Sequence, residues 1–170
     1  MKNLWSPWRS KYIESFKNEQ SGENCIFCEA LNFEVTDLNN LVVNKADQTY
    51  TLLNLYPYNN GHLMIVPNRH IREFESLTKD ESLEIMDQLR LAKLVLTEIY
   101  KPQGFNIGLN LGRAGGAGIE EHIHFHIVPR WSGDTNFMPV LGEVKVISQG
   151  LMETKKNMLE AYNRLFKKNS

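Results

Sequence analysis

Three histidines at alternate positions are the first candidates for chemistry in this chain. His122, His124 and His126 stand in the segment HIHFHIV at 122–128 and are three of the five histidines in the sequence. Side chains alternate between the two faces of a β-strand, so these imidazoles would project from one face, about 6.6–7 Å apart from one to the next. The alternatives are a solvent-exposed polar strand face and a metal site on these histidines alone. The apolar residues between them and the glycine-rich loop just before them favour a functional site.

The glycine-rich loop is GRAGGAG at 112–118, and it ends four residues before the first of these histidines. Glycine lets a backbone come close to a phosphate group and direct its N–H groups at the anion. Turns also use glycine, so composition alone is weak evidence. The position of the loop favours phosphate binding.

The two cysteines of the chain, Cys25 and Cys28, have the spacing C-x-x-C. In a reducing compartment this spacing indicates metal or redox chemistry more than a structural disulfide.

Short apolar segments follow from residue 25 onward, and their composition predicts a region that is mostly strand. The cluster YPYNNG at 56–61 predicts a turn. The predicted strands are 41–44, 49–54, 62–67, 105–111 and 122–128.

Two segments predict helices. Thr78 and Glu81 form a capping-box pattern, and an apolar stripe at spacings of three and four extends the helix over 78–101, before Pro102. A second amphipathic pattern runs through the C-terminal segment, with Leu151, Met158, Tyr162 and Leu165 on one face. A long helix among mostly antiparallel strands predicts an α+β domain.

Length and composition limit the classes of function. The chain has 170 residues, enough for one domain with its own core, and a formal net charge of −1. Its basic residues are dispersed, so we expect no nucleic-acid partner. No apolar run reaches the roughly 18–20 residues that span a bilayer, and proline and charge interrupt the N-terminus too early for a secretory segment. We therefore expect a cytoplasmic protein without membrane partners.

These residues together resemble the histidine-triad (HIT) superfamily. HIHFHIV matches the motif His-φ-His-φ-His-φ-φ completely, and Asn54, the pair Gly61-His62 and Asn110 agree with it. The resemblance extends from about Cys25 to about Met138, and it is greatest to the bacterial branch that includes diadenosine tetraphosphate phosphorylases and HIT hydrolases. It implies a HIT-like fold, an antiparallel sheet with one long helix and a C-terminal helix. We expect one domain over 1–170, with an N-terminal arm at 1–24, a core at 25–138 and a C-terminal strand and helix at 139–170.

The resemblance also implies catalytic roles. The middle histidine, His124, would attack the α-phosphorus of an adenosine nucleotide and form a labile adenylyl-histidine. Its other ring nitrogen must keep a proton on a fixed acceptor, usually a backbone carbonyl. His126 would contact the phosphate and stabilise charge on the leaving group, or act in orientation alone.

Nucleotide-binding residues follow from the same motif. Asn54 would bind the ribose hydroxyls, although a strand-end asparagine that begins a turn is the alternative. Many relatives carry a hydroxyl or amide side chain near the end of the glycine-rich loop, where this chain has Ala117, Gly118 and Ile119. The phosphate contacts would then come from the loop backbone and from two side chains: Gly115, Gly116 and Gly118, with Asn110 and Arg113.

In the zinc-bearing members, two histidines join the cysteines. The matching positions are His70 and His122, which with Cys25 and Cys28 would form a closed tetrahedral Zn²⁺ site. Four protein ligands leave no position for a reacting water, so the zinc would be structural. A redox C-x-x-C and two inert buried thiols are the alternatives.

The function that this resemblance implies is phosphorolysis of diadenosine tetraphosphate to ADP and ATP, with adenosine nucleotides or diadenosine polyphosphates and inorganic phosphate as partners. One alternative is a hydrolase of dinucleoside polyphosphates or nucleoside phosphoramidates. The other is a non-catalytic, nucleotide-binding regulatory protein. Family members are usually homodimers, and the helix at 78–101 and the aromatic arm offer apolar surface for such a contact.

Overall fold

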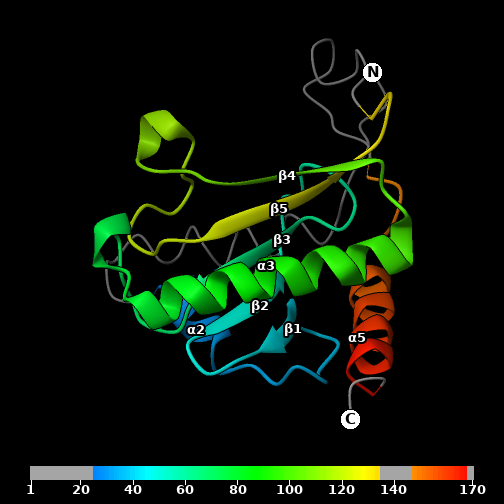
Figure 1. Cartoon of the computed structure of the whole chain (residues 1–170), viewed down its shortest axis with the longest axis horizontal. Coiled ribbons are helices and arrows are strands. Elements are labelled where there is room, and N and C mark those ends of the chain that lie inside the picture. The colour runs from blue at the N-terminus through cyan, green and yellow to red at the C-terminus, as the bar shows by residue number, and fades with distance from the viewer. Residues whose placement is uncertain (1–24, 135–146, 168–170) are drawn as a thin grey trace.

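The computed structural model describes residues 25–134 and 147–167, which form one antiparallel sheet covered by helices (Figure 1). The strand order is β1-β2-β3-β5-β4, so β1 and β4 are the sheet edges within the described part of the chain. The strands are β1 Val42–Lys45, β2 Thr49–Leu53, β3 Leu63–Pro67, β4 Gly104–Leu109 and β5 Phe125–Arg130. The predicted α+β class and the five predicted strands are confirmed, with end positions shifted by at most three residues.

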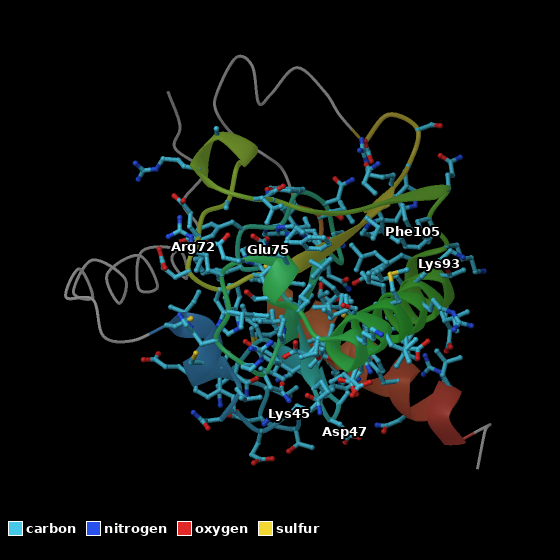
Figure 2. All side chains as sticks on the ribbon, turned by 60° about the vertical axis from the view of Figure 1, so that its left-hand side comes forward. Lys45, Asp47, Arg72, Glu75, Lys93 and Phe105 are labelled. Carbon is cyan, nitrogen blue, oxygen red and sulfur yellow. The ribbon has the colours of Figure 1, made fainter. Side chains whose placement is uncertain are left out.

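The long helix α3, Lys79–Tyr100, crosses one face of the sheet (Figure 1). The predicted capping box is present, because the Glu81 N–H donates to Thr78 Oγ1 and the Thr78 N–H donates to the Glu81 carboxylate. The buried side chains of α3 include Ile85, Leu89 and Leu96, which lie on the predicted apolar stripe. Lys93 Nζ of α3 lies 5.8 Å from the ring centroid of Phe105 on β4 (Figure 2).

The C-terminal helix α5, Leu151–Lys167, packs against α3 and β1. It buries Met158, Ala161 and Tyr162 in the same core as α3 and this face of the sheet. The predicted C-terminal helix is therefore confirmed. The predicted arm at 1–24 and most of the predicted strand after residue 139 lie outside the described residues.

The other face of the sheet carries a second apolar cluster and a short helix, α2, Ile26–Ala30. Phe27 of α2 packs with Val42, Leu52 and Met64 from three neighbouring strands. The prediction that the chain is mostly strand from residue 25 onward is wrong for α2, because five residues are too few to show a helical period.

The histidine segment enters the sheet later than predicted. β5 begins at Phe125, so His122 and His124 precede the ladder. The Ile123 N–H instead donates to the Ile71 carbonyl at 2.7 Å. The three imidazoles consequently do not share one strand face: His124 and His126 line a cavity, whereas His122 lies in a separate cluster.

No helix among the described residues is long and apolar enough to cross a membrane.

Candidate active site

A cavity of about 1250 Å³ lies on the α2 face of the sheet. Its floor is a row of side chains across adjacent strands, because Val42 pairs with Leu52, Leu52 with Met64, and Met64 with His126. Adjacent strands are about 4.8 Å apart, so this row spans about 14 Å from β5 to the β1 edge. His124 stands beside His126 at the β5 end, with 5.0 Å between the two ring centroids. The cavity is therefore an elongated trough with two histidines at one end.

One ring nitrogen of His124 is fixed by the backbone. Nδ1 lies 2.8 Å from the carbonyl oxygen of His122. A carbonyl only accepts hydrogen bonds, so Nδ1 must carry the proton and Nε2 keeps its lone pair. Burial lowers the pKa of His124 below its ordinary value, which favours the neutral imidazole. The ring therefore has the protonation state and the tautomer of a nucleophile at Nε2.

Two consecutive hydrogen bonds, from Tyr58 to His62 and from His62 to His126, determine the tautomer of His126. The Tyr58 N–H donates to His62 Nδ1 at 3.1 Å, so the proton of neutral His62 is on Nε2. That nitrogen lies 2.9 Å from His126 Nδ1 and donates to it. Neutral His126 then carries its proton on Nε2, which has no hydrogen-bond partner among the described residues. Burial, and then the proximity of His124, lower the pKa of His126 to about 4. His126 is thus a neutral donor at Nε2, on the wall of the cavity.

His62 belongs to the pair Gly61-His62 that agrees with the family motif, but no role in the site was predicted for it from the sequence. It is fully buried immediately before β3, and its Nε2–H donates to His126 Nδ1. Nothing in the spacing of HLMIVP separates it from an ordinary histidine at a strand end. The pairing of β3 with β5 is what brings the two rings together.

Of the predicted nucleotide-binding residues, four line the cavity beside the two histidines: Asn54, Asn110, Gly116 and Gly118. Asn54 also accepts the Tyr56 N–H at 2.8 Å, so it begins the following turn as the alternative predicted. Asn110 Nδ2 donates to the Gly116 carbonyl at 3.3 Å and closes the loop. Gly116 has φ +90°, a conformation that favours glycine.

The glycine-rich loop uses several of its own amides internally. The N–H groups of Gly115 and Ala117 donate to the Gly112 carbonyl, and that of Gly116 donates to Arg113. These bonds form a short 3₁₀ turn, Arg113–Gly115, whose residues are exposed and do not line the cavity. The structure thus does not bring Arg113 or Gly115 to the histidines. The predicted backbone contact with phosphate is left to the end of the loop, at Gly118.

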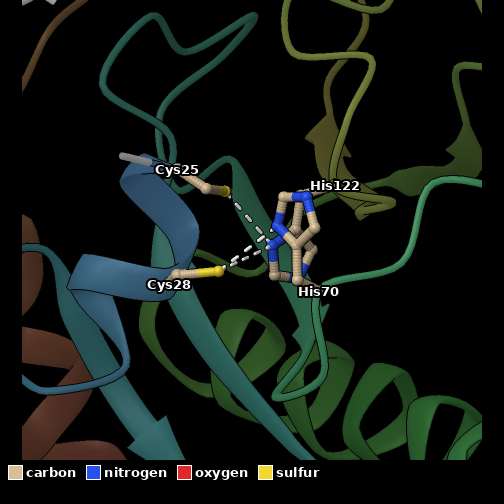
Figure 3. Close-up of side chains that lie close together, drawn as sticks. All are labelled: Cys25, Cys28, His70 and His122. Carbon is tan, nitrogen blue, oxygen red and sulfur yellow. Dashed lines mark hydrogen bonds between the residues drawn. The ribbon is translucent and has the colours of Figure 1, made fainter. Parts of the chain in front are cut away.

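The predicted metal ligands converge in a separate cluster (Figure 3). His122 Nδ1 lies 3.3 Å from Cys25 Sγ and 3.7 Å from Cys28 Sγ, and His70 Nδ1 lies 3.3 Å from Cys28 Sγ. Zinc–sulfur bonds of about 2.3 Å and zinc–nitrogen bonds of about 2.0–2.1 Å give tetrahedral edges of about 3.3–3.8 Å. All four ligand atoms lie within 4.8 Å of one another. The cluster can therefore hold a metal ion, and this donor set fits zinc.

The surroundings of the cluster also fit a cation. His122 Nε2 donates to the Pro67 carbonyl at 2.9 Å, which leaves Nδ1 free to coordinate and orients the ring. Burial lowers the pKa of His122 to about 4, so the imidazole is neutral, as a ligand must be. Burial and the neighbouring Cys25 raise the pKa of the Cys28 thiol. A bound cation would reverse that effect and stabilise the thiolate.

Comparison with known proteins identifies similar chains. The model of the HIT domain matches residues 35–133. The AP-4-A phosphorylase of Mycobacterium tuberculosis is 40% identical over 169 residues, which cover 96% of this chain and 86% of that protein.

Two solved structures share the fold. A hypothetical histidine triad nucleotide-binding protein from Sulfolobus tokodaii has a TM-score of 0.67 at 25% identity, covering 85% of this chain and 95% of its own. A zinc-bound histidine triad family protein from Mycobacterium smegmatis has a TM-score of 0.67 at 19% identity, covering 85% and 97%, respectively.

Proposed function

Because the chain belongs to the HIT domain family, we propose that it is an enzyme that transfers the adenylyl group of adenosine nucleotides through His124. The observation that carries this proposal is the hydrogen bond from His124 Nδ1 to the His122 carbonyl, which leaves the Nε2 lone pair available for attack. A buried, neutral imidazole is a competent nucleophile toward phosphorus without prior deprotonation.

The first step forms a bond between His124 Nε2 and the α-phosphorus, and it breaks the bond from that phosphorus to the bridging oxygen of the leaving phosphate. Negative charge grows on this oxygen. His126 Nε2–H is the donor that would hydrogen-bond to it, since His62 keeps the proton of His126 on that nitrogen. In the second step an acceptor oxygen attacks the phosphorus and restores free His124.

The trough would accommodate an adenosine nucleotide along its length. With the phosphate at the histidines, Asn54 lies where ribose hydroxyls would need a partner, and the base would rest on Met64, Leu52 and Val42. The cavity of about 1250 Å³ exceeds the range of about 300–1,000 Å³ that is usual for small-molecule pockets. This size favours a substrate with two nucleosides, such as a diadenosine polyphosphate.

We infer that phosphate is the acceptor, so that diadenosine tetraphosphate gives ADP and ATP. The support is the 40% identity with a protein named AP-4-A phosphorylase over almost the whole chain. Hydrolysis is the second candidate, because water could resolve the same adenylyl-histidine. A non-catalytic nucleotide-binding role would leave the fixed tautomers of His124 and His126 without a use.

Cys25, Cys28, His70 and His122 would hold a structural Zn²⁺. When bound, the metal would cross-link α2 to the segments after β3 and before β5. We assign no reaction step to it.

We also propose that the chain, a single HIT domain, forms a homodimer with a two-fold axis. β4 is an edge strand, and large apolar side chains are exposed on β4 and α3, including Ile107, Leu83 and Leu94. Light scattering should give twice the chain mass, and Ile107→Lys should shift the mass toward that of the monomer. A wild-type monomer at micromolar concentration would contradict this assembly.

A cytoplasmic location stays a prediction from the sequence.

The test of the function is to incubate the zinc-loaded protein with diadenosine tetraphosphate at increasing phosphate concentrations and to identify the nucleotide products. Phosphorolysis gives ADP plus ATP and stalls without phosphate. AMP plus ATP at every phosphate concentration would replace phosphorolysis by hydrolysis and keep the role of His124. Two ADP molecules would indicate attack away from the α-phosphorus and would contradict the His124 mechanism.

A further inference from the structure

Phe27 lies in sequence between Cys25 and Cys28 of the metal cluster, and its ring also contacts the candidate nucleophile His124. Its ring centroid is 5.5 Å from that of His122, in an edge-on arrangement, and 4.9 Å from that of His124. One side chain of α2 thus touches both a metal ligand and the residue proposed to attack phosphorus.

The same helix forms part of the cavity wall. Ile26, Phe27 and Ala30 all line the cavity that contains His124. Phe27 is 1% exposed, and its carbonyl accepts the Tyr50 hydroxyl at 2.6 Å. An isolated helix of five residues is not stable in water, so contacts with the rest of the fold must hold α2 in place. The two cysteines are anchors of this kind, one preceding the helix and one inside it.

His122 makes a second connection between the two sites. Its ring faces the cysteines through Nδ1, while its backbone carbonyl accepts a hydrogen bond from His124 Nδ1–H. A ligand that fixes the His122 ring therefore also restricts the backbone to which His124 is hydrogen-bonded.

We infer that Phe27 is a positioning residue that couples the metal cluster to His124, so that a metal held by the cluster sets the orientation of the His124 ring and the shape of the nucleotide cavity. The inference rests on the proposed function for the role of His124. Loss of the metal would free Cys25 and Cys28, so α2 would be held only by packing and hydrogen bonds such as the burial of Phe27 and its bond to Tyr50. The Phe27 ring would then hold His124 less firmly.

The first experiment compares zinc-loaded protein with protein stripped by a chelator. Nitrogen-15 spectra of the histidine rings report the tautomer of His124 without any substrate, and calorimetry reports the affinity for AMP. We expect one Nδ1-protonated form of His124 in the loaded protein, and a mixture of ring states with weaker AMP binding in the stripped protein. Circular dichroism shows whether the stripped protein is folded.

The second experiment keeps the metal and removes the ring contact. Phe27→Leu should retain zinc, because all four ligands remain, yet show the same mixed His124 signals. Its kcat should fall by about tenfold to a hundredfold, since a small misplacement of a reacting group has an effect of that size. Phe105→Leu is the matched control, because Phe105 packs against the main core, away from the cavity and the metal cluster. Its His124 signals and kcat should equal those of the wild type.

A folded, stripped protein with unchanged His124 signals and AMP affinity would overturn the inference. If stripping unfolds the protein, zinc-loaded Phe27→Leu decides, and wild-type His124 signals in that variant would overturn it. Failure of the proposed function is seen separately, as a wild-type protein that turns over no nucleotide while its His124 spectra still respond to the metal.

Discussion

At the scale of single residues, hydrogen bonds give the three histidines of HIHFHIV different roles. His122 uses Nε2 on the Pro67 carbonyl and presents Nδ1 to the cysteines. His124 uses Nδ1 on the His122 carbonyl and presents Nε2 to the cavity. His126 accepts at Nδ1 from His62 and presents a proton at Nε2. Identical side chains in alternation thus offer a candidate metal ligand, a lone pair and a donor.

Replacing His124 by Ala or Asn should abolish turnover, because neither side chain can form the adenylyl intermediate. We expect a loss of at least about a hundredfold in kcat. AMP affinity and melting temperature should change little, since the cavity floor and the core are untouched. The measurement is steady-state kinetics with calorimetry on the same sample. Activity above about a hundredth of the wild-type rate would remove His124 as the nucleophile.

Replacing His62 tests the tautomer of His126. His62→Leu removes the donor to His126 Nδ1, so the His126 proton can move to that nitrogen and leave Nε2 without one. Loss of a positioned donor usually lowers the rate by about 10²–10⁴-fold. We expect the fall in kcat to be at the low end, about 10²-fold, with KM almost unchanged.

His62→Gln is the matched variant, because its amide can still donate to His126. It should recover a large part of the rate lost in His62→Leu. Equal kcat values for the two variants at equal stability would mean that His62 acts only in packing.

At the residue scale, the sequence predicts side chains that carry a motif and misses those that act through pairing of distant strands. The four ligands of the metal cluster were predicted, and the structure brings them together. His62 was not predicted to act, because its role depends on the register between β3 and β5. Arg113 was predicted at the cavity, but the 3₁₀ turn of the loop exposes it.

At the scale of elements, local signals decide which predictions hold. α3 has both a capping box and a long apolar stripe, so its existence and its ends are predictable. α2 is a five-residue helix that follows Cys25 and contains Cys28. Packing of Phe27 against the sheet stabilises it, which no local pattern reveals. β5 begins late because the backbone N–H of Ile123 donates to the Ile71 carbonyl, beyond the end of β3, instead of to a strand of the ladder.

The start of α3 should be sensitive to acid. The Glu81 carboxylate accepts from Arg69 Nε at 2.9 Å, from Arg69 Nη2 at 2.8 Å and from the Thr78 N–H. The Arg69 guanidinium lowers the pKa of Glu81 from 4.5 to about 2. A carboxyl group with a depressed pKa stabilises the fold above its unfolded pKa and loses that contribution as pH falls through its folded pKa. The stability from Glu81 should therefore disappear between about pH 4.5 and about pH 2.

Glu81→Gln measures this contribution in chemical unfolding. At pH 7 it should lower the free energy of unfolding by about 1 kcal/mol, a modest value because Arg69 is half exposed. The difference from wild type should shrink as pH falls toward 2. Asp87→Asn is the control, since it breaks an exposed ion pair with Arg90 and should change stability little at any pH. A Glu81→Gln difference that stays constant with pH would contradict the assignment.

At the scale of the whole molecule, the metal cluster joins parts of the chain that are far apart in sequence. Cys25 and His122 are separated by 97 residues, and Cys28 and His70 by 42. The cluster connects α2, the loop after β3 and the segment before β5 at one end of the sheet (Figure 3). The main core between the sheet, α3 and α5 lies on the other face and does not include these residues. Metal binding should therefore stabilise a fold that already has a core.

Purified protein should contain about one zinc per chain, and Cys28→Ala should lose it. A ligand at a hundredfold excess over its Kd stabilises a fold by about 2.7 kcal/mol. That energy corresponds to a melting temperature about 5–10 °C higher in a protein of this size. Elemental analysis and calorimetric melts with and without chelator measure both quantities.

Asn32→Ala is the control, because Asn32 contacts the backbone of Cys28 without offering a ligand, so zinc content should stay at one. Since the main core is independent of the cluster, the metal-free protein should melt cooperatively at the lower temperature. Metal-free wild type with an unchanged melting temperature would exclude a structural zinc at these four residues.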